Sequence, residues 1–149
     1  MLGAALLAGC SGIKPYPDTT PKNLSVTTEA PSGSVLSRMR VALHVHRVDA
    51  GCKTDYQGTV QLDEPAIRVG IPADRQSYLV FTFSGSSLLE GSSHMSYGTL
   101  LQPRAGLGYE ARVRYKDGIY HVELRESGAR GAAGREIERR TLADCGRSR

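Results

Sequence analysis

A pair of histidines, His44 and His46, has the residue type and spacing that come closest to a chemical site. Residues i and i+2 of a β-strand project from the same face, and imidazole is a common ligand of zinc and copper. A metal site needs at least a third ligand, and the similar pair His121 and Glu123 lies in a separate segment among arginines. Arginines also precede His44 on its own face of the strand. We therefore predict solvent-facing histidines rather than a metal site.

The other residue patterns contain no recognisable catalytic arrangement. No G-x-S-x-G motif occurs, and the serine-rich stretch from Ser84 to Ser93 is predicted to be a loop between strands. Gly128, Gly131 and Gly134 are spaced G-x-x-G-x-x-G, which is neither the Walker loop nor the dinucleotide fingerprint, and they indicate a loop. The sequence therefore predicts a protein that is not an enzyme and has no cofactor.

Length and charge narrow the class of protein further. A chain of 149 residues suits one domain, and no apolar run approaches the roughly 18 residues that a membrane-spanning helix needs. The net charge is +4, from 19 Lys and Arg against 15 Asp and Glu. This excess is typical of solvated strand faces, and attraction to lipid head groups, lipopolysaccharide phosphates or an acidic protein is the alternative. Aromatic residues do not alternate with a basic cluster, so a nucleic-acid partner is not expected.

The N-terminal ten residues form an apolar run that ends in the motif Leu7-Ala8-Gly9-Cys10. This motif resembles the lipobox of bacterial lipoproteins, in which Leu, a small residue and Gly or Ala precede an invariant Cys. The resemblance implies that residues 1–9 are a signal peptide, that Cys10 carries a diacylglycerol, and that its new amino group is acylated, as with palmitate. Several acyl chains are needed because one gives only marginal membrane binding. Ser11 after the cysteine implies delivery to the outer membrane.

The residues on either side of Cys10 refine this interpretation. A secretory leader begins with a positive charge, yet no Lys or Arg precedes Cys10, so we expect the true leader to start upstream of Met1. The alternative is a short buried strand with a packed cysteine. The stretch from Ser11 to Lys22 contains three prolines and is predicted to be a tether. Residues 23–30 are β-prone and are either a first strand or more of the tether.

Two further cysteines remain if Cys10 is acylated. An exported protein lies in an oxidising compartment, where such a pair usually bonds, so the resemblance implies a Cys52–Cys145 disulfide. The chain-entropy model gives about 4–5 kcal/mol for closing so long a loop. The alternative, two free thiols used for metal binding or redox chemistry, lacks a C-x-x-C motif.

The elements that position these residues are predicted from a sequence pattern with a period of two. Apolar and polar residues alternate over 38–48, 56–63, 66–71, 78–83 and, less regularly, 93–101. Gly, Pro, Ser and Asp separate these stretches at intervals of about ten residues, which indicates a sandwich or barrel. We predict an all-β fold, an immunoglobulin- or transthyretin-like sandwich of about seven to nine antiparallel strands with one disulfide. The tail over 135–144 is predicted to be an edge strand, with a short helix as the alternative.

The stretch from Tyr109 to Glu126 is the clearest single unit. Asp117-Gly118 is a strong signal for a two-residue type I′ turn. This turn sets a register in which apolar residues face apolar residues on one side of the hairpin. On the other side, opposite charges meet. The apolar pairs are Tyr115–Tyr120, Val113–Val122 and Ala111–Leu124, and the charged pairs are Arg112–Glu123 and Glu110–Arg125.

Together these patterns give one expected organisation. Residues 1–9 are the leader, 10–35 the lipidated cysteine and tether, 36–146 the sandwich, and 147–149 a tail. We expect a lipoprotein anchored to the outer membrane through Cys10 and facing the periplasm, which acts as a non-catalytic binding or structural module with a protein partner in an envelope assembly. The alternatives are an inhibitor or immunity lipoprotein that blocks a hydrolase or toxin, with the stretch from Ser84 to His94 as a plug, and, ranked last, a periplasmic metal-binding protein.

Overall fold

The fold was analysed in a computed structural model that describes residues 12–29, 37–87, 91–117, 119–127 and 134–147. The predicted leader, Cys10, Gly128 and Gly131 lie outside these residues. Within them the chain forms two β-sheets and one 3-10 turn, and none of the described residues belongs to a helix long and apolar enough to cross a membrane. The prediction of an all-β fold is confirmed.

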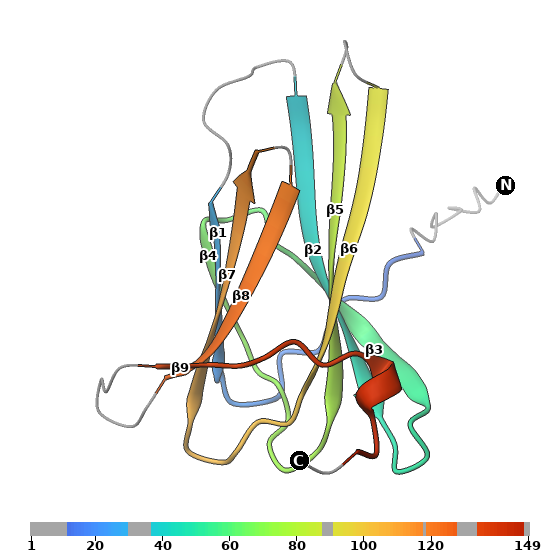
Figure 1. Cartoon of the computed structure of the whole chain (residues 1–149), viewed down its shortest axis with the longest axis vertical. Coiled ribbons are helices and arrows are strands. Elements are labelled where there is room, and N and C mark those ends of the chain that lie inside the picture. The colour runs from blue at the N-terminus through green and yellow to red at the C-terminus, as the bar shows by residue number, and fades with distance from the viewer. Residues whose placement is uncertain (1–11, 30–36, 88–90, 118, 128–133, 148–149) are drawn as a thin grey trace, which may run out of the picture.

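The strands follow the predicted alternating stretches closely (Figure 1). Their bounds are β1 Leu24–Glu29, β2 Ser37–Val48, β3 Thr54–Gln61, β4 Ala66–Val69, β5 Ser77–Ser87, β6 Gly91–Leu101, β7 Gly108–Lys116, β8 Ile119–Ser127 and β9 Arg135–Glu136. The stretch from Ser84 to Ser93, predicted to be a loop, is mostly strand, because it belongs to the ends of β5 and β6. Cross-strand pairing of these two ends overrides the weak β-propensity of their Ser and Gly residues.

The nine strands divide into two sheets with the orders β4-β1-β7-β8-β9 and β3-β2-β5-β6. The prediction that all strands are antiparallel is wrong at one position, since β1 pairs with β7 in parallel, with Leu24 opposite Tyr109. Antiparallel pairs can be joined by a short hairpin, whereas β1 and β7 are far apart in the sequence and meet only when the domain folds. Of the two alternatives expected for residues 23–30, a first strand or more of the tether, the strand is therefore correct, and β1 lies inside its sheet.

The hydrophobic core lies between the two sheets. In the middle of β2, β5, β7 and β8, every second residue faces inward and is buried, as the alternation predicts. Leu43 and Phe81 are fully buried in the four-stranded sheet, and Ala111 is fully buried opposite them. Each large apolar side chain buried in this way contributes about 1.5–3 kcal/mol of transfer free energy.

The β7–β8 hairpin has the predicted register. Val113 lies opposite Val122, and all five predicted pairs are present. Asp117 has a φ of 54°, as the first central position of a type I′ turn requires. The ion pairs differ from the expectation, because Glu123 binds Arg114 on the diagonal rather than the Arg112 opposite it. Long side chains reach diagonal neighbours as easily as directly opposite ones.

The segment before β1 is packed against the fold rather than free. We call residues 14–22 the N-terminal strap. The Tyr16 backbone N–H donates to the Thr59 carbonyl of β3 at 3.0 Å, and the Tyr16 hydroxyl donates to the Gly70 carbonyl, just after β4, at 2.8 Å. The strap therefore joins the β3 edge of one sheet to the β4 edge of the other and covers one open side of the sandwich.

The segment after β9 covers the opposite side, and we call residues 137–145 the C-terminal strap. The Ile137 N–H donates to the Leu124 carbonyl of β8 at 2.8 Å, and the Leu100 N–H of β6 donates to the Arg140 carbonyl at 2.7 Å. The predicted edge strand is limited to β9, and the 3-10 turn η2 (Leu142–Asp144) follows it. Figure 1 shows this strap crossing the lower end of the sandwich toward β3.

A disulfide between Cys52 and Cys145 fixes the end of the C-terminal strap. The two Cα atoms are 5.9 Å apart, inside the usual range for a disulfide, and 93 positions separate the residues in sequence. Cys52 lies in the β2–β3 turn with a positive φ of 64°. The bond thus connects the end of the domain to the far edge of the four-stranded sheet.

Candidate functional site

The outer surface of the four-stranded sheet carries the two histidines singled out by the sequence. Its residues alternate with the buried core positions and form facing pairs across β3, β2, β5 and β6. We call its central part the neutral face, because no acid or strong base lies there, while the exposed Arg40 continues the same side of β2 opposite Ser84. The members of the neutral face are Ala42, His44, His46, Tyr56, Tyr78, Val80, Thr82, Ser84, His94 and Ser96.

His44 lies at the centre of a hydroxyl network on the neutral face. Its Nδ1 is 2.7 Å from the Thr59 hydroxyl and its Nε2 is 3.0 Å from the Thr82 hydroxyl. The Tyr56 hydroxyl hydrogen-bonds the same Thr59 oxygen. Burial lowers the pKa of His44. His44 thus lies on the outer face, as predicted, but it is half-buried, because hydroxyls from β3 and β5 flank both of its ring nitrogens.

His46 lies between two tyrosines. The centroid of its ring is 5.3 Å from that of Tyr56 and 6.4 Å from that of Tyr78. Burial lowers the pKa of His46, the neighbouring His44 lowers it further, and Asp55 partly opposes this. The lowered pKa values favour the neutral forms of His44 and His46 at pH 7, so this part of the neutral face presents uncharged imidazoles, tyrosine rings and hydroxyl groups.

The metal hypothesis gains no further ligand from the tertiary structure. Among the residues described, no three His, Cys, Asp or Glu side chains come together in a group that could hold a metal ion. His121 lies on the other sheet, opposite Arg114 in the register that the sequence predicts. Both nitrogens of His44 already have hydroxyl partners, so a metal would have to displace them.

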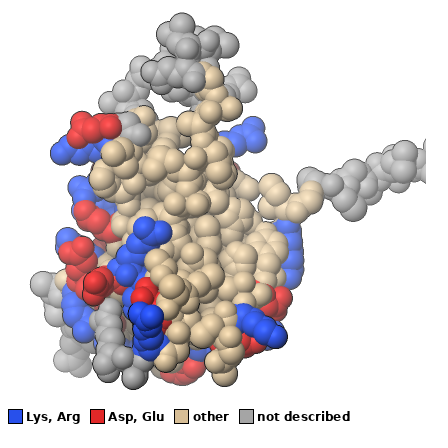
Figure 2. Space-filling model, turned by 45° about the vertical axis from the view of Figure 1, so that its right-hand side comes forward, with Lys and Arg blue, Asp and Glu red and all other residues tan. Residues whose placement is uncertain are grey.

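The outer surface of the five-stranded sheet is of the opposite kind. Arg112 lies 3.4 Å from Glu110 on the same strand, and Arg114 pairs with Glu123 across the hairpin. Figure 2, which turns the side of β6 toward the viewer, shows most charged residues along the left side and the base, a few at the right edge, and a broad uncharged surface in the upper middle. The two outer faces of the sandwich thus differ sharply in charge.

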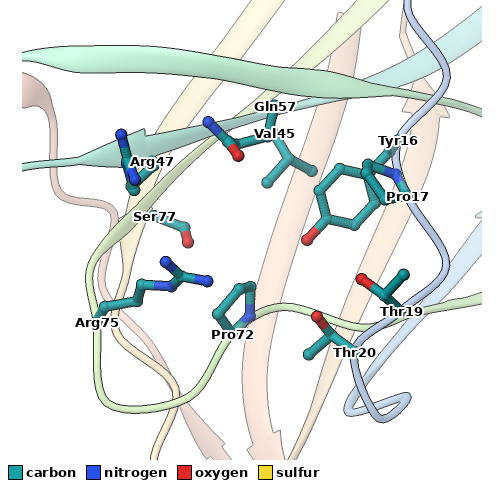
Figure 3. Close-up of a pocket in the computed structure, with 10 residues that line it drawn as sticks. All are labelled: Tyr16, Pro17, Thr19, Thr20, Val45, Arg47, Gln57, Pro72, Arg75 and Ser77. Carbon is teal, nitrogen blue, oxygen red and sulfur yellow. The ribbon is translucent and has the colours of Figure 1, made fainter.

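A small pocket lies where the N-terminal strap crosses the sheet edges (Figure 3), and we call it the strap pocket. Its volume is about 90 Å³, and its lining combines residues of the strap, β2, β3, the β4–β5 loop and the start of β5. The lining residues are Tyr16, Pro17, Thr19, Thr20, Val45, Arg47, Gln57, Pro72, Arg75 and Ser77. The Arg75 guanidinium and the Tyr16 hydroxyl face each other across the opening. Burial raises the pKa of Tyr16, and the charge of Arg75 partly offsets this.

A larger cavity of about 270 Å³ lies between the sheets. Its inner wall is apolar and includes Met39, Val41 and Val113, and its lining also includes Glu29, Asp63 and Glu64. The Thr28 hydroxyl at its wall is buried and has no hydrogen-bond partner within the described part of the chain. Because the lining is continuous with the core, we interpret this cavity as a packing feature of the sandwich.

Sequence reasoning found the two histidines but missed their partners and the strap pocket. The period-two pattern Tyr78-x-Val80-x-Thr82 was a signal for one side of the network, but it does not reveal which strand lies next to β2. Arg75 and Tyr16 carry no signal at all, since they lie in a loop and in a proline-rich segment. Comparisons with protein-family models, with curated proteins and with solved structures give no match for this chain.

Proposed function

We propose that this chain is a bacterial lipoprotein, anchored to the outer membrane through acylated Cys10 and facing the periplasm. The Leu7-Ala8-Gly9-Cys10 motif carries this proposal, because it places a cysteine directly after an apolar run. The pairing of Cys52 with Cys145 is consistent with it, since disulfides persist in oxidising compartments such as the periplasm. Acylation would use the third cysteine.

Mass spectrometry of the membrane-extracted protein tests the anchor. We expect an N-terminal peptide that begins at Cys10 and carries acyl groups. Replacing the nucleophile by Cys10→Ser should shift the protein from the membrane fraction to the soluble fraction. An unmodified peptide that contains Cys10 would contradict the proposal.

We further propose that the protein is a non-catalytic binding module and that the neutral face binds a protein partner in an envelope assembly. The observation that carries this proposal is the uncharged surface around His46, Tyr56 and Tyr78. Protein interfaces are depleted of charge at their centres and enriched in tyrosine. A face that combines rings with hydroxyl groups supplies both apolar contact and hydrogen bonds.

Co-purification from cross-linked membranes tests the binding face. Ser96→Arg places a charge on the neutral face at an exposed position, and Ser127→Arg places the same charge on the opposite sheet as a matched control. An unpaired charge buried in an interface costs more than about 1.4 kcal/mol, so Ser96→Arg should weaken recovery of the partner at least about tenfold. Equal recovery with both variants would argue against this face.

We propose the transthyretin-like rather than the immunoglobulin-like form of the sandwich. An immunoglobulin sandwich groups its first strand with its second, fifth and fourth strands. Here β1 instead lies between β4 and β7, while β2 lies between β3 and β5. This strand order supports the second of the two forms expected from the sequence.

An inhibitor or immunity lipoprotein is the second candidate function, and one feature favours it. In Figure 1 the upper ends of β5 and β6 extend beyond the β7–β8 hairpin. A projecting hairpin with exposed Ser92 and Ser93 is suited to entering the cleft of a hydrolase. Recovery of one soluble hydrolase, rather than a multi-subunit envelope complex, would support this function over the first.

A further inference from the structure

The chain joins the fold only a few residues after Cys10. Hydrogen bonds to Thr59 hold the backbone of Lys14 and Tyr16 on β3, with N···O distances of 2.8 and 3.0 Å. Lys14 lies four positions after Cys10, and an extended chain advances at most about 3.5 Å per residue. An acylated Cys10 therefore lies within about 14 Å of the edge of the sandwich that carries the N-terminal strap.

The strap pocket lies on this same edge and carries two guanidinium groups. No carboxylate lies within ion-pair distance of Arg75 among the described residues. Arg47 lies 3.1 Å from Asp55, in a pair that is exposed to solvent. The pocket thus has an excess of positive charge, with the hydroxyls of Thr19 and Thr20 on its strap side (Figure 3).

We propose that the strap pocket binds the phosphate group of an anionic membrane phospholipid, so that the strap edge of the domain lies against the bilayer. A guanidinium presents a planar fork of donors that matches phosphate oxygens. A volume of about 90 Å³ admits a phosphate but not a lipid tail, which would stay in the bilayer beside the acyl chains of Cys10. This inference rests on the proposed anchor.

The short connection to Cys10 makes a weak phosphate contact sufficient. One Lys or Arg near an anionic bilayer contributes only about 1 kcal/mol. Because the anchor already holds the domain at the bilayer surface, this contribution only has to bias the orientation of the domain, and about 1 kcal/mol favours one orientation about fivefold. The orientation that follows places the opposite side of the sandwich, where the C-terminal strap contacts β6 and β8, away from the bilayer.

Coupling the full chain to vesicles tests this orientation independently of what happens in the cell. Only Cys10 has a free thiol, because Cys52 and Cys145 are bonded to each other. It can therefore be joined to a maleimide lipid in vesicles of phosphatidylglycerol and phosphatidylcholine. Hydrogen exchange measured by mass spectrometry then reports which segments contact the bilayer. We expect slower exchange over residues 14–22 and 72–76 than in the uncoupled chain.

Two arginine variants separate the pocket from general attraction. Arg75→Gln should remove about 1 kcal/mol of attraction to the anionic bilayer, which should reduce the protection about fivefold. Arg125→Gln removes the same charge from an exposed position on the five-stranded sheet and should leave protection unchanged. Equal protection in both variants, or protection spread over the whole domain, would overturn the proposal.

The source of the phosphate and the anchor are tested separately. If the Cys10→Ser chain binds inorganic phosphate in solution, but the chain coupled to vesicles through Cys10 shows no protection, the assignment to a lipid is overturned. An unmodified Cys10 in cells would overturn the anchor, and with it this role in the cell. If Cys10 is acylated in cells but the vesicle-coupled chain shows no slower exchange over residues 14–22 and 72–76, only the proposed role of the strap pocket is overturned.

Discussion

The two straps close opposite sides of the same sandwich by different means. The N-terminal strap is held by backbone hydrogen bonds to Thr59 and by the Tyr16 hydroxyl. The C-terminal strap has comparable hydrogen bonds through Arg140, but a covalent bond to Cys52 also fixes its end. One side of the sandwich therefore depends on the redox state of its surroundings and the other does not.

This difference between the straps bears on the proposed anchor. The N-terminal strap lies next to the proposed attachment point and depends on close packing, since added atoms at Gly58 or Gly70 would strike its backbone. The C-terminal strap lies on the other side and is tied by an oxidative step that export would provide. Four experiments can break or sharpen this comparison, and they follow from the largest expected effect to the smallest.

The largest effect should come from removing the disulfide. Cys52→Ser with Cys145→Ser opens a constraint across 93 positions, and the chain-entropy model gives a loss of about 4–5 kcal/mol in the free energy of unfolding. Urea unfolding followed by circular dichroism measures this loss. Cys10→Ser should leave the free energy of unfolding unchanged, and an equal loss in that control would contradict the assignment.

Gly70→Ala should release the N-terminal strap. A Cβ at this position would overlap the Thr20 carbonyl oxygen, a backbone atom that cannot move without displacing the strap. Such overpacking costs about 1–3 kcal/mol. We expect faster amide hydrogen exchange at Tyr16 together with lower stability. Gly12→Ala, whose Cβ would meet no atom within 4 Å, serves as the control.

Single contacts in the two straps provide a matched comparison. Tyr16→Phe removes the hydrogen bond to the Gly70 carbonyl, at about 1 kcal/mol. Arg139→Met removes a 3.0 Å hydrogen bond to the Gly98 carbonyl and a cation–π contact with Tyr97, at a similar cost of about 1 kcal/mol.

Repeating both substitutions in the chain without the disulfide sharpens this comparison. If the bond holds the C-terminal strap in place, the cost of Arg139→Met should shrink when the bond is absent, because contacts that share one element are coupled. The cost of Tyr16→Phe should not change. Equal costs in both backgrounds would show that the C-terminal strap stays in place without its disulfide.

The smallest effect concerns pH. The pKa values of His44 and His46 are lowered by burial, so the unfolded chain binds more protons below its ordinary pKa of about 6.5. Stability is therefore complete above that pH and decreases as pH falls toward the folded-state pKa values. Thermal unfolding at pH 7.5 and 5.0 should show this decrease. His46→Gln should reduce it, and His121→Gln on the other sheet should not.

Local signals predicted much of this fold because they act over a few residues. The alternation in β2 and β5 located both strands, and Asp117 with Gly118 predicted the register of the β7–β8 hairpin. Charge pairing was less predictable, since Glu123 reaches the diagonal Arg114 instead of its direct neighbour. Side-chain reach depends on the twist of the sheet, which the sequence pattern does not contain.

The candidate site was predicted only in part. The sequence singled out His44 and His46, but it could not supply Thr59 and Thr82, which come from the two strands that flank β2. The proline-rich strap was interpreted as a free tether because proline disfavours helix and central strand. That rule does not predict that the Tyr16 hydroxyl donates a hydrogen bond to the distant Gly70 carbonyl.

The sequence by itself determined the strand content, the hairpin register and the cysteine pair expected to bond. These properties follow from the period of two, from turn chemistry and from residue type. Only the tertiary structure decided that β1 lies in parallel with β7, that hydroxyls surround His44, and that Arg75 faces Tyr16 across a pocket. The physical reason is that these contacts join segments that are distant in the chain, and their partners are selected by the packing of the whole sandwich.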